Sequence, residues 1–212
     1  MLDIKILKQY SQEELFERLR RVCLMGQINS LVYKDAVFSL EENVSPNEIC
    51  IPQTYVLEAN LRNILNLWLS LKMQGVDIFL LRGFVKVEVD YGGGNRIVRD
   101  VLPPVVECSV ADGCIKLLND GMHRLFLPWW MKRRLNVVYI SGASHPYYAF
   151  PFEGSLSSVR VIPGSVKPEG FDGKRYRLPG KEYKKLFRDF NSVFENVTFS
   201  RRKEDFGKDW CG

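Results

Sequence analysis

The sequence is poor in the residues from which redox and metal centres are built. Its 212 residues include only two histidines and five cysteines, and no Cys-x-x-Cys pair occurs. The cysteines are odd in number and irregularly spaced, a pattern that fits neither a disulfide framework nor a structural zinc site. We therefore predict no protein-built metal site and a reducing, cytoplasmic location.

Long apolar runs are missing as well. No segment approaches the roughly 18 uncharged apolar residues that a membrane-spanning helix needs. The start of the chain, MLDIKILKQYSQEEL, has none of the three parts of a signal peptide. Of all residues in the chain, 46% are hydrophobic and 12% are aromatic, which is typical of a folded protein with one sizeable core. We expect no membrane partner.

Positive charge is concentrated towards the end of the chain. The net charge is +5, and residues 160–212 hold 13 Lys and Arg against 8 Asp and Glu, so the preceding part is balanced. A basic surface of this size is either simply solvated or attracts phosphate-bearing partners. Nucleic acid, bound through residues 174–203, is one such partner.

Three segments show the periodicity of an amphipathic helix. Residues 11–25 begin with a Ser-x-x-Glu capping box. Residues 55–73 carry a wide apolar face, which predicts burial against a sheet. Residues 181–196 form the third pattern. We expect residues 30–53, which contain the turn-forming run NVSPNE, to be irregular.

Strand patterns occupy the middle of the chain. Strict alternation over residues 85–90 predicts a strand with one solvated face. Residues 92–95, GGGN, are interpreted as a plain hairpin turn, since neither a helix nor Gly-Lys-Ser/Thr follows. Residues 103–119 predict two short strands joined by the turn Asp112-Gly113. The apolar run at 136–141 predicts a buried strand.

Between these last strands lies the motif NDGMHR, which predicts a turn opening a helix. Gly121 lets the backbone approach a ligand closely, and the first helical turn exposes N–H groups at the positive end of the macrodipole. His123 and Arg124 add positive charge at an end that disfavours cations, unless an anion such as phosphate binds there. Asp120 then caps the helix, orients His123 or holds a metal ion that bridges phosphates. The alternative is a common turn with an ordinary cap, in which Arg124 pairs with a surface carboxylate.

Two further features are candidates for ligand contacts. His145 follows the buried strand, where open α/β sheets tend to bind ligands, although an ordinary loop histidine fits equally. Tyr147 and Tyr148 are able to stack on a base, but aromatic residues beside a proline also simply pack. The helix after the motif contains Pro128, which predicts a kink or a restart there.

The stretch VLPPVVECSVADGCIKLLNDGMHR, followed by a helix and NVVYI, resembles the core of the ParB/sulfiredoxin-like superfamily over about residues 97–140. In that family a hairpin strand runs into a Gly-x-x-Arg or Asp-Gly-x-His-Arg turn that opens a helix and holds nucleotide phosphates. Members include ATP-dependent sulfiredoxins, CTP-binding partition proteins and ADP-dependent free-serine kinases. The resemblance implies a phosphate-binding set at the corresponding positions: Asp120, Gly121, Met122, His123 and Arg124.

Departures from the family patterns narrow the resemblance. Sulfiredoxins have their catalytic cysteine where this chain has Met122, whose thioether cannot act as a thiolate nucleophile. After Pro151 the sequence offers one convincing helix, too few for the helix-turn-helix module of the partition proteins. The kinase-like members are nearest. Their first motif histidine is missing, however, and no pattern selects a catalytic glutamate among Glu41, Glu42 and Glu48.

We therefore predict an α+β fold with a mixed, mostly antiparallel sheet flanked by helices. Its parts are an N-terminal helical extension (1–75), a ParB/sulfiredoxin-like nucleotide-binding core (76–150) and a basic, loop-rich region with one helix (151–212). The predicted ligand is ATP, ADP or CTP, with Mg²⁺ as an optional companion. An enzyme of this kind would be a phosphotransferase with a small-molecule acceptor or a nucleotide hydrolase, with His123 and Asp120 as catalytic residues and His145 as an additional ligand contact. The alternative is a non-enzymatic protein associated with nucleic acid.

Overall fold

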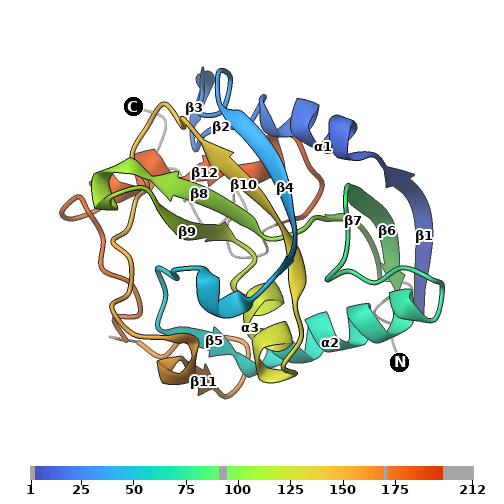
Figure 1. Ribbon diagram of the computed structural model, residues 1–212. Helices are drawn as coiled ribbons and strands as arrows, with labels where there is room; N and C mark the ends of the chain where they lie inside the picture. Colours follow the sequence, from blue (N-terminus) through green and yellow to red (C-terminus); the bar gives the residue numbers. More distant parts are fainter. Residues whose placement is uncertain (1–2, 91–94, 170, 198–212) are drawn as a thin grey trace.

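The computed structural model describes residues 3–90, 95–169 and 171–197 (Figure 1). Within these residues the chain forms three α-helices and several small sheets. The helices are α1 (Gln12–Leu19), α2 (Glu58–Lys72) and α3 (Met122–Trp130). Most strand pairings are antiparallel, so the predicted mixed, mostly antiparallel α+β fold is confirmed.

The central sheet has four strands in the order β4-β10-β8-β9. Its members are β4 (Val37–Val44), β10 (Leu135–Ser141), β8 (Val105–Ser109) and β9 (Ile115–Asp120). β8 and β9 form the predicted hairpin, whose turn places Gly113 in the left-handed conformation with φ 78°. β10 is buried as predicted, because it lies between β4, which it pairs with in antiparallel fashion, and β8, to which it is parallel.

A second sheet joins β1 (Asp3–Tyr10), β6 (Phe84–Asp90) and β7 (Arg96–Val101). The alternation predicted for β6 is confirmed, since Val85, Val87 and Val89 are all at most 1% exposed. β6 pairs with β7 in antiparallel register up to Asp90 opposite Arg96. The predicted glycine turn between them falls on residues 91–94, which lie outside the described part of the chain.

Two smaller sheets complete the strand pairing. The first joins β11 (Arg160–Ile162) to β5 (Tyr55–Leu57), so the predicted helix over residues 55–73 begins three residues late. The second joins β12 (Arg188–Asp189), β2 (Cys23–Leu24) and β3 (Gln27–Leu31). Because β2 takes Cys23 and Leu24, α1 ends at Leu19 rather than Met25, although its capping box is present as predicted.

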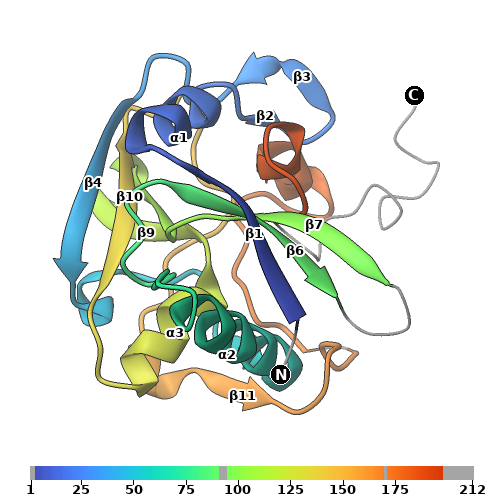
Figure 2. The same ribbon diagram turned by 90° about the vertical axis from the view of Figure 1, so that its right-hand side faces the viewer.

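The strands lie between α1 on one side and α2 with α3 on the other (Figure 1 and Figure 2). On the central sheet, Val106 and Val137 face the cluster that includes α2 and α3. Val105 and Val138, their neighbours in sequence, face the opposite cluster with α1. A sheet covered on both faces has near-continuous apolar strands, which accounts for the sequences of β8 and β10.

Two sequence predictions of local structure are wrong. Residues 30–53 are not irregular, because they contain β4 and the 3₁₀ helix η1 (Pro46–Glu48). β4 pairs with only one strand among the described residues, so it lies at an edge of the sheet and much of it is solvated. Its sequence is therefore polar and lacks the apolar pattern from which a strand is predicted. The first 75 residues consequently supply strands as well as helices, which corrects the helical extension. Residues 181–196 form no α-helix. They divide into η4 (Glu182–Leu186), β12 and η5 (Phe190–Ser192).

The cysteine prediction also needs correction. Cys108 and Cys114 form a disulfide across the β8–β9 hairpin, with their Cα atoms 4.9 Å apart. Irregular spacing along the whole chain does not reveal a pair that a local hairpin brings together. The remaining short 3₁₀ helices are η2 (Val110–Asp112) and η3 (Leu156–Ser158). Among the described residues, no helix has the length and apolar character needed to cross a membrane.

Candidate functional site

The turn between β9 and α3 has the geometry that the motif predicts. Gly121 occupies the N-cap position with φ 98° and ψ 28°, which glycine adopts without strain. A Cβ atom there would lie 3.1 Å from the Cα and Cβ atoms of Pro104. Glycine provides no capping side chain, and no other described side chain accepts a hydrogen bond from the first amides of α3. The helix therefore presents free N–H groups at its start.

Asp120 and Arg124 form an ion pair within the turn. The Arg124 guanidinium donates hydrogen bonds to the Asp120 carboxylate and to the main-chain carbonyl of Leu102. Arg124 is only 7% exposed. Among the described side chains, Asp120 neither caps α3 nor forms a hydrogen bond with His123, and its partner is Arg124. The alternative interpretation of Arg124, pairing with a carboxylate, is the arrangement observed, with Asp120 of the same turn as the partner.

His123 is held by the neighbouring strand β5. Its Nε2 atom accepts a hydrogen bond from the Leu57 N–H, at 3.1 Å. Burial, as the largest cause, and the positive charges of Arg124 and Lys174 together lower its pKa from 6.5 to about 4. His123 is therefore neutral at pH 7. Since Nε2 is the acceptor, the proton resides on Nδ1, which is left as a hydrogen-bond donor.

Lys174 is a site residue that sequence reasoning did not select. Its ammonium donates to the Tyr148 hydroxyl at 2.8 Å and lies 5.2 Å from the centre of that ring. The Gly173 carbonyl accepts a hydrogen bond from the Thr54 N–H, which fixes this segment beside β5. Within residues 3–90, 95–169 and 171–197, no carboxylate pairs with Lys174. Only the basic run KRYR hinted at it, and nothing linked that run to the motif 50 residues earlier.

Two other predicted site residues take different positions. Met122 is partly buried and packs against the core cluster of α2 and α3. His145 lies beyond the end of β10, in the lining of a cavity of about 190 Å³ to which none of residues 120–124 contributes. Its Nδ1 atom is 2.8 Å from the Ser144 hydroxyl. The structure thus brings residues 120–124 together and places His145 in a separate cavity. Tyr147 and Tyr148 are buried, as the packing alternative predicts.

A fully buried ion pair lies beside that cavity and was not predicted. Arg188 is 0% exposed and donates to both carboxylate oxygens of Glu107, at 2.9 and 2.8 Å. Its other N–H groups reach the carbonyls of His145, Pro146 and Leu186. Tyr33 and Asn119 also donate hydrogen bonds to Glu107. Instead of the predicted continuous helix, residues 181–196 place Arg188 in β12, between η4 and η5, where its guanidinium makes these contacts.

The remaining acidic candidates have partners elsewhere. Glu41 pairs with Lys116 at 2.6 Å, and Glu42 pairs with Arg82 at 2.9 Å. The Glu48 carboxylate accepts a hydrogen bond from the Ser45 N–H. In the part of the chain that the structure describes, no group of three His, Cys, Asp or Glu side chains is placed to hold a metal ion. α3 also continues through Pro128 to Trp130 without a restart.

Fold and turn together define the class: a mixed α+β domain in which a sheet strand enters a glycine turn that opens a helix. The chain belongs to the ParB CE domain family, whose model matches residues 14–160. This match confirms the resemblance to the ParB/sulfiredoxin-like superfamily and extends well beyond residues 97–140. No curated protein sequence and no solved structure matches the chain significantly.

Proposed function

We propose that the protein binds the phosphate groups of a nucleotide at the start of α3. The observation that carries the proposal is the uncapped N-terminus of α3 together with the Lys174 ammonium, whose charge acts on His123 and which pairs with no described carboxylate. Burial is the main reason that the pKa of His123 falls to about 4. The charges of Arg124 and Lys174 lower this pKa as well, so their field disfavours a further cation and favours an anion. Membership of a ParB-type family supports nucleotide phosphates as that anion.

Each residue then has a distinct part in binding. The amides after Gly121 hold a phosphate oxygen, and Lys174 neutralises its charge. His123 donates a hydrogen bond from Nδ1, as a neutral imidazole. Arg124 keeps the turn in shape through its ion pair with Asp120, whose carboxylate offsets its charge. Arg124 is therefore mainly a positioning residue, in contrast to the direct phosphate ligand that the family resemblance implies.

Binding is the best-supported part of this function. ATP, ADP and CTP are the proposed ligands, and a kinase-like phosphoryl transfer or nucleotide hydrolysis in the cytoplasm is the corresponding extension. That extension requires a carboxylate beyond the Asp120–Arg124 pair, and the three glutamates considered above are engaged elsewhere. We therefore place binding before catalysis.

A thermal-shift series tests the proposal. ATP, ADP, CTP, GTP and inorganic tripolyphosphate are titrated into the full chain with and without Mg²⁺. A ligand at 100 times its Kd raises the free energy of unfolding by about 2.7 kcal/mol. Lys174→Met should weaken binding about tenfold, by loss of one charge-assisted contact. Lys181→Met, an exposed lysine in the same region, is the matched control. Equal affinities of the two variants would contradict a phosphate site at α3, as would no shift with any ligand.

Nucleic acid is the second candidate, and family membership is the observation that favours it. Several basic side chains of the C-terminal region already have acidic partners: Arg175 pairs with Glu153, and Lys185 pairs with Glu182. This pairing weakens a footprint over residues 174–197. A nucleic-acid interface predicts affinity that falls steeply with salt. It would also survive Lys174→Met, which separates it from the phosphate site.

A further inference from the structure

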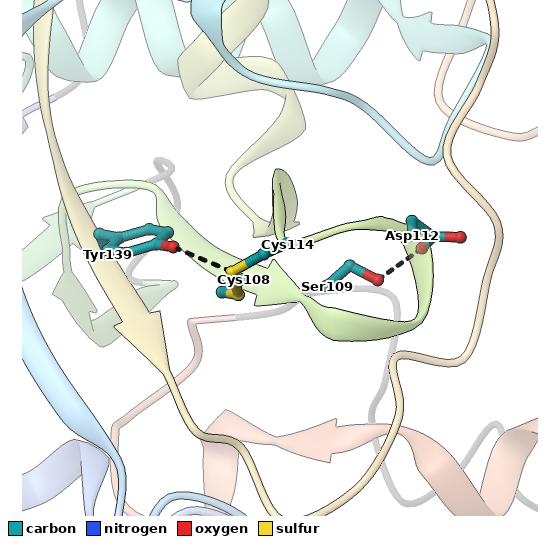
Figure 3. Close-up of a disulfide and its surroundings, with 5 residues drawn as sticks. All are labelled: Cys108, Ser109, Asp112, Cys114 and Tyr139. Atoms are coloured by element: carbon teal, nitrogen blue, oxygen red, sulfur yellow. Dashed lines mark hydrogen bonds between the residues drawn. A yellow bond between two sulfur atoms is a disulfide. The ribbon is translucent and has the colours of Figure 1, made fainter.

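The Cys108–Cys114 disulfide closes the turn that carries Asp112 (Figure 3). The Asp112 carboxylate accepts a hydrogen bond from the Ser109 hydroxyl inside the turn. It also pairs with Arg177, and both side chains of this pair are largely buried, at 16% and 13% exposure. A local turn is thereby bonded to a segment more than 60 residues further along the chain.

Arg177 belongs to the segment that supplies Lys174. The Arg177 N–H donates to the Tyr148 carbonyl at 3.0 Å, and the Phe150 N–H donates to the Arg175 carbonyl at 2.8 Å. Lys174 in turn donates to the hydroxyl of Tyr148. The position of residues 174–177 therefore depends on the Asp112 contact and on a short pairing with residues 148–150. A change at the Asp112 turn therefore alters the support of the segment that carries Lys174, whose charge acts on His123.

The two sulfur atoms of the disulfide have different surroundings. Cys114 is exposed, and its sulfur lies 4.0 Å from the Tyr139 hydroxyl (Figure 3). Cys108 is 7% exposed and lines the cavity of about 190 Å³ that His145 also lines. An external thiolate is able to reach Cys114 from solvent. Cys108, on the protected side, is then the leaving group.

We propose that Cys108–Cys114 is a reversible disulfide whose reduction by a cellular dithiol loosens the Asp112–Arg177 contact and thereby the segment carrying Lys174. In the first step a thiolate of the dithiol attacks the Cys114 sulfur, the disulfide bond breaks, and the electron pair leaves on the Cys108 sulfur. The second thiol of the reductant then attacks the mixed disulfide and releases Cys114. The dithiol is oxidised by two electrons to its own disulfide, and its two protons end on Cys108 and Cys114.

Cys50, a free cysteine near the disulfide, does not compete with the external thiolate in this exchange. Cys50 lies beside β9, since its N–H donates to the Lys116 carbonyl and its own carbonyl accepts from the Leu118 N–H. Burial raises the pKa of the Cys50 thiol, and the Asp112 carboxylate raises it further. Because the thiolate is the attacking species, a protonated Cys50 is a poor competitor. The disulfide therefore exchanges with the external dithiol and not with Cys50.

Hydrogen exchange of the full chain tests the proposal without any nucleotide. The oxidised protein is treated with dithiothreitol under native conditions, new thiols are counted, and amide exchange is compared before and after. Reduction should expose two new thiols. It should also accelerate exchange of the Arg177 and Phe150 amides about tenfold, while amides in the middle of α2 remain unchanged. Cys108→Ser/Cys114→Ser should reproduce the reduced pattern. Oxidised Asp112→Asn should show the same acceleration with the disulfide intact.

Two results would overturn the proposal. One is a disulfide that stays closed in the native protein at dithiothreitol concentrations that reduce the denatured chain. The other is a disulfide that opens while the Arg177 and Phe150 amides keep their exchange rates. The effect of reduction on phosphate affinity rests on the proposed function, and it is measured separately by repeating the tripolyphosphate titration. A chain that binds no phosphate therefore leaves the exchange result standing.

Discussion

Replacing Arg188 by methionine isolates the buried ion pair with Glu107. Arg188 is 0% exposed and its guanidinium donates to two carboxylate oxygens and three carbonyls, so methionine removes five hydrogen bonds while preserving most of the side-chain volume. Glu107, 2% exposed, is left with Tyr33 and Asn119 as donors but without a counter-charge. Breaking a buried pair in this way costs about 3–5 kcal/mol.

Denaturant unfolding at pH 7, followed by tryptophan fluorescence, measures this cost. Arg175→Met is the matched control, because the Arg175–Glu153 pair is 67% and 84% exposed and such pairs contribute about 1 kcal/mol or less. The double substitution Arg188→Met/Glu107→Gln should recover part of the loss, since no buried charge remains. If Arg188→Met costs no more than Arg175→Met, or the double variant is less stable than the sum of its single changes, the assignment of an uncompensated Glu107 charge is refuted.

Three further predictions concern the α3 turn and α1. The pKa of His123 is about 4 in the folded chain against 6.5 normally, so between these pH values the unfolded chain binds the proton preferentially. The free energy of unfolding is therefore full above pH 6.5 and falls by at most about 3 kcal/mol towards pH 4. His123→Gln should remove this loss in urea titrations repeated across that pH range. Gly121→Ala should lower the free energy of unfolding by about 1–3 kcal/mol more than Gly75→Ala in the same assay, because both glycines have positive φ but only a Cβ at Gly121 would meet Pro104. Equal losses would argue against the close approach of Pro104. Ser11→Ala removes the cap of α1 and should lower the unfolding free energy by about 1 kcal/mol. Ser158→Ala, at an exposed serine that caps no helix, serves as its control.

The features that sequence predicted are those encoded over short distances. The Ser11–Glu14 box, the alternation of β6 and the Asp112–Gly113 hairpin each depend on residues a few positions apart, and all three are present. The left-handed Gly121 at the start of α3 belongs to the same group.

The features that sequence missed depend on distant partners. Arg188 meets Glu107 across 81 positions, and no pattern in either segment signals the other. The amphipathic spacing of residues 181–196 predicted a helix, because the pattern within this segment carries no information about the distant partner Glu107. The charge of Lys174 acts on His123 only because a loop brings the two segments near each other. Asp120 was expected to cap α3, to orient His123 or to hold a metal ion, and its pairing with Arg124 depends on how the turn closes.

The strand order β4-β10-β8-β9 sets the sequence of events during synthesis. β10 is the piece that joins β4 to the hairpin, and it emerges from the ribosome almost 100 residues after β4. Until then β4 has no partner in this sheet. Glu107 remains without its counter-charge for longer, because Arg188 is synthesised later still. A chain whose central pairing spans such distances folds slowly and exposes unpaired strand edges on the way. Nascent chains that have released β10 but not yet Arg188 would therefore depend most on chaperones, because their central sheet is able to form while Glu107 still lacks its counter-charge.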